Sequence, residues 1–404
     1  MSVKNDIIKI YEFTRTLIQK LNDSGDYIKR IRKLGIVDIL YFLMLHFGLH
    51  KKSYTKTNNI LKIDSYANCT NTSIDKKINK IGLPLLEKIN QELSNFIYPE
   101  KHGRRIVGID GSIVRIPSCC HEEGIKYGNK KELYCNVLFS SLYDLEKLVP
   151  IDYSVFKSQS ERDALNYQSK YLKPKDVLVA DRGYYSSEVI KLLNEKGIDF
   201  VLRVKSNAFG NLKNMKSGDI TTIDGVDIRI IRFYSIEGGE EYIIVTSLME
   251  ENELFFKDVY KKRWHIETNF RELKYGLTLN DWNIKSLKKF KIKLLTHRLI
   301  MIYIGYFTKS IEVMCSKFSN YKIKSNRESC IDLFIERIVK IFFRSTLKKM
   351  TKKTIKKIYV TLDIFAEIIK KNLIYYISYR SSPRTKVSPS SKWGSYGNVF
   401  QGYG

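Results

Sequence analysis

The pattern of hydrophobic and polar residues divides the chain into a helical part, a strand-rich part and a second helical part. Residues 1 to about 98 have periodic Ile and Leu positions that predict helices, with a strongly apolar stretch from Ile36 to His46. From about Arg104 the pattern changes to short β-branched runs, and we predict strands at Arg105–Ile116, Leu133–Leu142 and Leu148–Phe156. The first of these strands contains a turn-like Asp110-Gly111-Ser112.

Helices and strands then alternate. The pattern predicts a helix at Ser160–Tyr171, a buried strand at Asp176–Ala180, a helix at Ser187–Lys196 closed by Gly197, and a strand at Phe200–Lys205. Three hairpin-like strands followed by alternating strands and helices predict an α/β fold with a sheet of mixed direction.

The rest of the chain shows three different sequence patterns. Residues 208 to about 250 are short strands punctuated by glycine, such as Asp227–Tyr234 and Glu241–Thr246, and they predict a β-rich insertion. Residues of about 285 to 375 read as Lys-studded helices, and residues 381–404, rich in Ser, Gly and Pro, predict a disordered tail. We therefore expect a helical region at 1–98 and a catalytic domain at 99–380. The helical region is either a DNA-binding domain or a cap on the next domain, and the sequence favours neither.

The net charge of the chain limits the classes of molecule that it is expected to bind. Its 404 residues carry a formal net charge of +27, with 70 Lys and Arg against 43 Asp and Glu. Such a charge favours a polyanion, either nucleic acid or an anionic membrane surface, although a biased nucleotide composition would also enrich lysine. The longest apolar run, Leu299–Phe307, is too short to cross a bilayer, and the start of the sequence has no secretory signal. None of the six cysteines forms a C-x-x-C pair, so a reduced, cytoplasmic protein without a structural zinc site is expected.

One short segment, from Tyr260 to Lys274, concentrates unusual chemistry. On a single helix, Tyr260, Arg263, Glu267 and Lys274 lie within about 60° of one another. A stripe with an acid between two cations suits a metal-dependent site that also holds phosphate. A solvated helix face is the alternative interpretation.

Two aspartates elsewhere in the chain are candidate site residues together with this helix. Asp110 lies in or just after the first strand, and Asp181 ends a later strand. If these acids and Glu267 meet at one edge of the sheet, their mutual repulsion favours Mg²⁺ or Mn²⁺ binding. Two such ions suit phosphodiester chemistry.

These motifs resemble those of bacterial insertion-sequence transposases of the IS4 family, which have a DDE catalytic domain. The resemblance covers roughly residues 100 to 280. It rests on the segments Ile109–Ser112, Asp181–Tyr184 and Gly197–Arg203, and on the ungapped spacing Tyr-x2-Arg-x3-Glu-x6-Lys that starts at Tyr260. It implies an RNase H-like core with the β-rich insertion between the second Asp and the Glu.

The resemblance also implies roles for individual residues. Asp110, Asp181 and Glu267 match the metal-binding catalytic acids, and Tyr260, Arg263 and Lys274 match contacts to the phosphates of the transposon end. Trp264 matches a residue on which some members stack a flipped base, and Arg182 is a further candidate contact to DNA. The insertion contains no Trp that could be a second stacking residue, and Phe233 or Tyr234 is the candidate substitute.

The implied activity is cut-and-paste transposition by cleavage and strand transfer at terminal inverted repeats, using two divalent ions. The partners are terminal-repeat and target DNA, the protein acting as a homodimer in a synaptic complex in the bacterial cytoplasm. Two alternatives stay open: an RNase H-like nuclease that does not join DNA, and a transposase-derived DNA-binding protein without catalysis.

Overall fold

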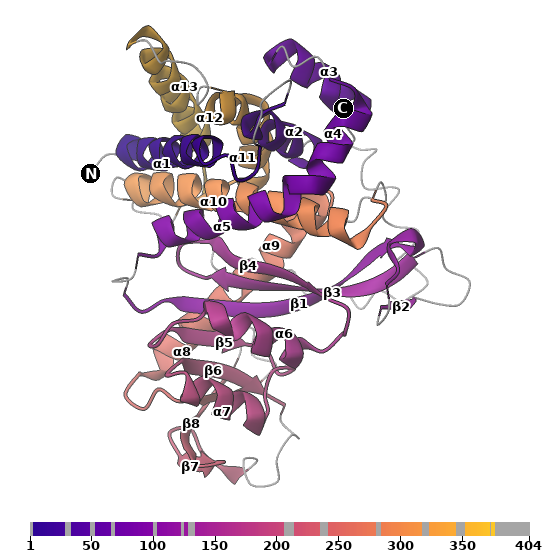
Figure 1. The fold of residues 1–404 in the computed structure, drawn as a ribbon. Helices are drawn as coiled ribbons and strands as arrows, with labels where there is room; N and C mark the ends of the chain where they lie inside the picture. Colours follow the sequence, from indigo (N-terminus) through magenta and orange to yellow (C-terminus); the bar gives the residue numbers. More distant parts are fainter. Residues whose placement is uncertain are drawn as a thin grey trace, which may run out of the picture.

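A central sheet carries helices on both faces and a thick layer of helices along one side. The computed structural model describes residues 3–28, 34–48, 53–65, 69–99, 103–122, 125–127, 134–205, 214–234, 241–279, 284–316, 323–344, 352–371 and 373–375. In Figure 1, α6 and α7 lie in front of the sheet, α9 lies behind it, and the helical layer forms the upper part of the molecule. The predicted tail at 381–404 lies outside the described residues.

The sheet is mixed and has nine described strands, in the order β2-β3-β1-β5-β6-β9-β8-β7, and β4 pairs with β3 on the same edge as β2, opposite β1. The neighbours β1, β5 and β6 run parallel, and the other pairs are antiparallel. The strands are β1 (Ile106–Pro117), β2 (Lys126–Tyr127), β3 (Tyr134–Asp144), β4 (Val149–Phe156), β5 (Val177–Ala180), β6 (Asp199–Val204), β7 (Ile220–Ile223), β8 (Val226–Tyr234) and β9 (Glu241–Thr246). The expected mixed α/β sheet is therefore present.

The first strand runs without a break through its turn-like Asp-Gly-Ser segment. Asp110 is paired with Ser141 of β3, and Gly111 and Ser112 continue the same antiparallel ladder. The strand predicted at Arg105–Ile116 is confirmed as β1, but the turn-like Asp110-Gly111-Ser112 within it forms no turn, because the ladder with β3 continues through it. Asp110 thus lies in the middle of a strand, where its backbone is fixed by pairing.

The strands predicted as a β-rich insertion extend the central sheet. Strand β9 pairs antiparallel with β6, starting from Val201 opposite Thr246, and β8 and β7 follow it outwards. The pair Asp227–Tyr234 and Glu241–Thr246 was predicted as strands and agrees closely with β8 and β9.

The helices that flank the sheet begin at side-chain caps. Ser160 accepts a hydrogen bond from the backbone N–H of Asp163, and Ser186 accepts one from Val189. Gly197, with φ of 64°, ends the second helix as its sequence position predicted. These helices are α6 (Glu161–Gln168), with a 3-10 turn at Ser169–Tyr171, and α7 (Ser187–Glu195).

The N-terminal and C-terminal helices pack into one layer. Helix α10 is central to it, contacting α1, α2 and α5 on one side and β4 on the other. Its Tyr303 hydroxyl lies 2.7 Å from the Thr14 hydroxyl of α1, deep in the layer. The N-terminal helices are α1 (Val3–Asp23), α2 (Ile36–Gly48), α3 (Tyr54–Ser65), α4 (Asn71–Lys77), the π-helix η1 (Ile78–Gly82) and α5 (Leu83–Ile97). The C-terminal elements are α10 (Leu287–Ser316), β10 (Ile323–Ser325), α11 (Arg327–Leu333), the π-helix η6 (Phe334–Ile338), α12 (Val339–Arg344), α13 (Lys352–Lys371) and β11 (Leu373–Tyr375).

The helical layer meets the sheet at the turn between β3 and β4. The backbone oxygen of Leu148 accepts hydrogen bonds from the Tyr143 hydroxyl at 2.7 Å and from Nη1 of Arg327 at 3.0 Å. Gly305 of α10 lies against the same carbonyl, so closely that a Cβ there would collide with it. Among the described residues, no helix is long and apolar enough to cross a membrane, and the apolar run Leu299–Phe307 lies within α10 with all its residues but Tyr306 buried.

Candidate active site

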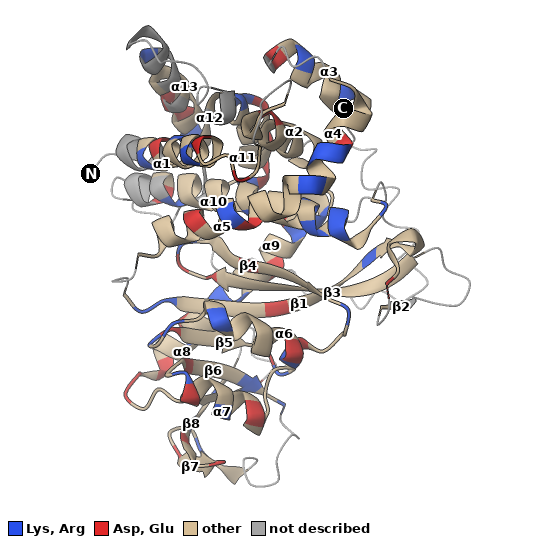
Figure 2. Ribbon diagram, in the orientation of Figure 1, with Lys and Arg blue, Asp and Glu red and all other residues tan. Residues whose placement is uncertain are grey.

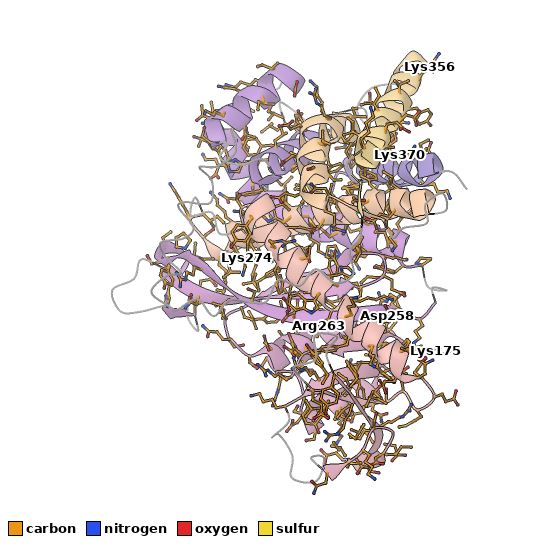
Figure 3. The ribbon with its side chains drawn as sticks, turned by 180° about the vertical axis from the view of Figure 1, so that it is seen from behind. Lys175, Asp258, Arg263, Lys274, Lys356 and Lys370 are labelled. Carbon is orange, nitrogen blue, oxygen red and sulfur yellow. The ribbon has the colours of Figure 1, made fainter. Side chains whose placement is uncertain are left out.

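The segment expected to be one continuous helix is built from three pieces. They are α8 (Glu253–Lys262), α9 (Trp264–Arg271) and the π-helix η5 (Glu272–Gly276). The α-helical ladder is interrupted at Arg263, where tighter bonds link Arg263 N–H to the Tyr260 oxygen and Ile266 N–H to the Arg263 oxygen. The expectation of a single regular helix was wrong. These pieces cross the back of the sheet in Figure 3, with Arg263 and Lys274 along them.

Tyr260 connects this helix to the end of β5. Its hydroxyl donates a hydrogen bond to Oδ1 of Asp181 at 3.1 Å, and its ring is buried. Burial raises the pKa of Tyr260, and Asp181 also raises it, so the hydroxyl remains a donor near neutral pH. Asp181 is also approached by Nη1 of Arg203 on β6, at 3.9 Å.

Arg263 contacts the other two candidate acids. Its Nη1 lies 3.4 Å from Oδ2 of Asp110 and its Nη2 lies 2.9 Å from Oε1 of Glu267. Burial alone would lower the pKa of Arg263, but Tyr260 and the three acids raise it by more. The net pKa is raised, so the guanidinium stays charged. Burial raises the pKa of Asp110 to about 7 despite the nearby arginine.

Lys274 reaches the strand that carries Asp110. Its Nζ donates to Oγ of Ser112 at 2.7 Å. Ser112 lies two residues after Asp110 on an extended strand, so both side chains project from the same face. Burial lowers the pKa of Lys274, while Asp110 acts in the opposite direction.

The parallel pairing of β1 and β5 explains why Asp110 and Asp181 come together. Ile109 is paired with Ala180, and each candidate aspartate is the next residue along its chain. The structure therefore gathers Asp110, Asp181 and Glu267 around two arginines. Their role as catalytic acids stays a prediction.

The other predicted residues lie outside this group. Trp264, the residue after Arg263, is 50 % exposed, and Arg182, the residue after Asp181, is also exposed. Of the two candidate substitutes for a second stacking Trp, Phe233 is buried and stacked on Tyr242, whereas Tyr234 is 67 % exposed. Tyr234 is thus the more accessible of the two.

The donor set fits a hard divalent cation. Three carboxylates from three different elements supply the oxygen ligands that Mg²⁺ prefers, and they already share the positive charge of Arg263. Within the part of the chain that the structure describes, no three acidic, Cys or His side chains are close enough to hold a metal as they stand. Since Arg263 contacts both Asp110 and Glu267, an ion bound by these acids would compete with the guanidinium.

Three residues that contact or adjoin the site were not predicted to have roles. Arg203 approaches Asp181, Ser112 accepts from Lys274, and Glu161 on α6 lies near both aspartates. Arg203 is a strand residue whose neighbour across the sheet cannot be read from periodicity. Glu161 looked like an ordinary acid in the first turn of a helix.

Comparison with known proteins gives one family. The sequence model of a family described as Transposase DDE domain matches residues 101–304, half of the chain, which includes all three candidate acids. No curated protein matches. Among solved structures, the chain resembles a piggyBac transposase synaptic complex with hairpin DNA, with 13 % identity, a TM-score of 0.47 and coverage of 96 % of this chain and 86 % of that one. On the strength of the sequence match, this chain belongs to the transposase DDE-domain family.

Proposed function

We propose that this protein is a cut-and-paste transposase of the IS4 type, with Asp110, Asp181 and Glu267 as its catalytic acids. The observation that carries the proposal is the pair of contacts from Arg263 to Asp110 and Glu267, at 3.4 and 2.9 Å. With Tyr260 bonded to Asp181, residues from widely separated parts of the family match meet at one point. In this proposal each member of the Tyr-Arg-Glu-Lys signature has a place in the site: Glu267 is one of the acids, Tyr260 and Arg263 contact acids, and Lys274 contacts the strand that carries Asp110.

The strand arrangement supports an RNase H-like core. Strands β4, β3 and β1 form an antiparallel set, and β5 and β6 continue it in parallel with β1. In this proposal β7 to β9 are the insertion between the second Asp and the Glu, joined edge to edge to the core sheet.

Transposases of the DDE family generally use divalent metal ions. Here Asp110, Asp181 and Glu267 would hold them, and bound ions would activate the attacking oxygen and stabilise the leaving one. The acids would have to be ionised for this. Arg263, displaced from Asp110 and Glu267, would be free to hold a phosphate by its planar pair of donors.

The remaining residues of the site would position DNA. Lys274 offers a half-buried ammonium beside the same strand, and Tyr260 orients Asp181. The exposed ring of Trp264 is placed to stack a flipped base, an interaction that contributes about 1–3 kcal/mol. Tyr234 is the candidate second platform, and Arg182 is an exposed candidate contact to DNA.

The proposed reaction is a series of in-line phosphoryl transfers at one site. Water attack at the transposon end frees a 3′-OH, which attacks the opposite strand to give a hairpin. A second water opens the hairpin, and the released 3′-OH then joins target DNA. Each step replaces one oxygen on phosphorus by another, so the same acids can serve all of them.

Binding of the metal should depend on pH because of Asp110. With a pKa of about 7, this carboxyl is mostly protonated at pH 6 and mostly ionised at pH 8 in the metal-free protein. Since a divalent ion binds the ionised form, the affinity for Mn²⁺ should be about tenfold weaker at pH 6 than at pH 8. Titrations followed by electron paramagnetic resonance at pH 6, 7 and 8 measure this, and an affinity that does not change with pH would contradict it.

The helical layer offers a basic surface next to the site, which we propose binds DNA flanking the cleavage point. Lysines of α4, η1 and the start of α10 gather there (Figure 2). The ammonium of Lys289 lies 2.7 Å from Asp75, and Lys288 donates to the Asn79 oxygen at 2.6 Å, so the two regions are joined. Lys293, also on α10, donates to the Thr278 oxygen just beyond η5.

Removal of two exposed lysines tests this surface. Lys285 and Lys291 are exposed near the start of α10. The double change Lys285→Gln with Lys291→Gln should weaken binding to any duplex and lower the slope of log affinity against log salt by about two. The matched control is Lys191→Gln with Lys196→Gln, which removes the same charge from exposed positions on and just after α7. Fluorescence anisotropy at several salt concentrations gives both slopes, and equal losses for the two variants would rule the surface out.

The proposed function is tested by an assay for the joining of transposon-end DNA to target DNA. The purified protein is incubated with Mg²⁺, a labelled duplex of the terminal inverted repeat and a target plasmid. A transposase gives labelled plasmid, a nuclease gives only cut duplex, and a DNA-binding protein without catalysis gives neither. The proposed synaptic homodimer predicts that two end duplexes are held in one complex, which light scattering with the bound duplex measures.

A further inference from the structure

A fourth carboxylate, that of Glu161, lines a cavity together with glycines that closely follow Asp110 and Asp181 in the chain. The cavity has a volume of about 540 Å³ and is lined by Glu161, Gly111 and Gly183 among others. Glu161 is the first residue of α6, on the face of the sheet opposite the helical pieces that carry Arg263. It comes from an element that contributes none of the three candidate acids.

Two glycines make room for this carboxylate. A Cβ at Gly111 would lie 2.8 Å from Oε1 of Glu161, and a Cβ at Gly183 would lie 2.6 Å from its Oε2. Gly111 directly follows Asp110, and Gly183 comes two residues after Asp181. The Glu161 carboxylate therefore rests on backbone adjoining both aspartates, in space that any larger residue at these positions would fill.

The start of α6 is fastened to the loop after β5. Arg162 donates from Nε to the Gly183 oxygen at 3.3 Å and from Nη2 to the Tyr185 oxygen at 3.0 Å. Ser160 caps the helix through the N–H of Asp163. These bonds tie the start of the helix that carries Glu161 to the loop that follows Asp181.

Glu161 differs from the candidate acids in lacking a cation. Asp110 and Glu267 share Arg263, and Asp181 is approached by Arg203. Among the described residues, the Glu161 carboxylate makes no hydrogen bond or ion pair, since the guanidinium of its neighbour Arg162 is directed to backbone oxygens. Burial raises the pKa of Glu161, and the like charge of Asp181 raises it further.

A buried tyrosine, Tyr184, interacts electrostatically with the same carboxylates. Tyr184 is fully buried, and its hydroxyl has no hydrogen-bond partner of normal geometry among the described residues. Burial raises the pKa of Tyr184 well above its usual value, and Glu161 and Asp110 are the next largest causes. The hydroxyl therefore stays neutral, with Ser140 as its nearest hydrogen-bonding side chain and both carboxylates close enough to affect its pKa.

We propose that Glu161 is a fourth oxygen ligand of the divalent cation, so that β1, α6, the end of β5 and α9 each contribute one carboxylate. This inference rests on the proposed function for the identity of the ion. The site would then be closed on both faces of the sheet, by α9 on one and by α6 on the other. In the metal-free protein Arg263 balances Asp110 and Glu267, and a bound ion would replace that charge and also supply the charge that Glu161 lacks.

The test measures Mn²⁺ binding to the DNA-free protein by electron paramagnetic resonance. Glu161→Gln should weaken binding at least tenfold. The matched control is Asp163→Asn, an exposed acid in the same helical turn, which should bind as the parent does. Unchanged binding by Glu161→Gln would overturn the proposal.

A second variant keeps every carboxylate. Gly183→Ala should displace the flexible end of Glu161 without disturbing the backbone, and so should also weaken Mn²⁺ binding. Combining it with Glu161→Gln should cause no further loss, because both changes remove one interaction. Additive losses would overturn the proposal, as would normal binding by Gly183→Ala if Glu161→Gln fails to fold.

The result is separable from the proposed function. A parent protein that binds Mn²⁺ but joins no DNA would end the transposase proposal and leave the Glu161 comparison intact. A parent that binds no Mn²⁺ would overturn both.

Discussion

Glu267→Gln is expected to lower DNA cleavage by about 10³-fold or more, which corresponds to roughly 4 kcal/mol of transition-state stabilisation. The change removes one negative charge from the acids that would hold the metal and alters no shape. The amide oxygen can still accept from Nη2 of Arg263, now 2.9 Å from the carboxylate, so the local structure should persist. Binding to the end duplex should change little, because Arg263 and Lys274 remain.

The measurement is the rate of end cleavage under single-turnover conditions with saturating Mg²⁺, alongside the affinity for uncleaved duplex. Glu253→Gln is the matched control, since Glu253 is an exposed acid of α8 that pairs with Lys257, away from the candidate acids. It should cleave at the parent rate. A Glu267→Gln protein that cleaves within a few-fold of the parent would remove Glu267 from the catalytic acids.

Arg327→Ala should be the most destabilising single change away from the site, lowering the free energy of unfolding by about 3–5 kcal/mol. Arg327 is buried, its Nε lies 3.1 Å from Oε1 of Glu272, and Nη1 donates to the Leu148 oxygen. Burial lowers the pKa of Arg327, but Glu272, Tyr143 and Glu312 raise it, with a net rise. Without the guanidinium, two buried acids would lose their compensating charge.

Urea titration followed by circular dichroism gives the unfolding free energy. Arg337→Ala, an exposed arginine of η6, should stay within about 0.5 kcal/mol of the parent. Adding Glu272→Gln to Arg327→Ala should recover part of the loss, because it removes one of the unpaired charges. A loss below about 1 kcal/mol for Arg327→Ala would mean that water or a shifted side chain replaces the guanidinium.

The sequence predicted the elements of the site better than its three-dimensional connections. Short apolar runs identified β5, β8 and β9, and Gly197 marked the end of α7, since these signals depend on near neighbours in the chain. The interruption at Arg263 and the π-helix at Glu272–Gly276 could not be predicted, because a regular helical period was assumed for that segment.

Long-range partners were beyond sequence patterns altogether. Nothing near Asp181 in the chain indicated that β6 would bring Arg203 towards it, and nothing near Glu161 indicated that two glycines would leave space for its carboxylate. The pairing of Glu272 with Arg327 joins residues of different elements in the same way. Such contacts are set by strand order and helix packing, which a single sequence does not encode in any local period.

The ion pair of Arg327 and Glu272 sets how far a truncated form of this protein must extend. The family match ends at residue 304, in the middle of α10, whereas Arg327 lies beyond it. A truncated protein ending at residue 304 would keep every signature residue but lose the cation that pairs with Glu272, the residue directly after α9. The shortest fragment worth expressing therefore extends through α11, because the unit that folds is longer than the unit that carries the signature.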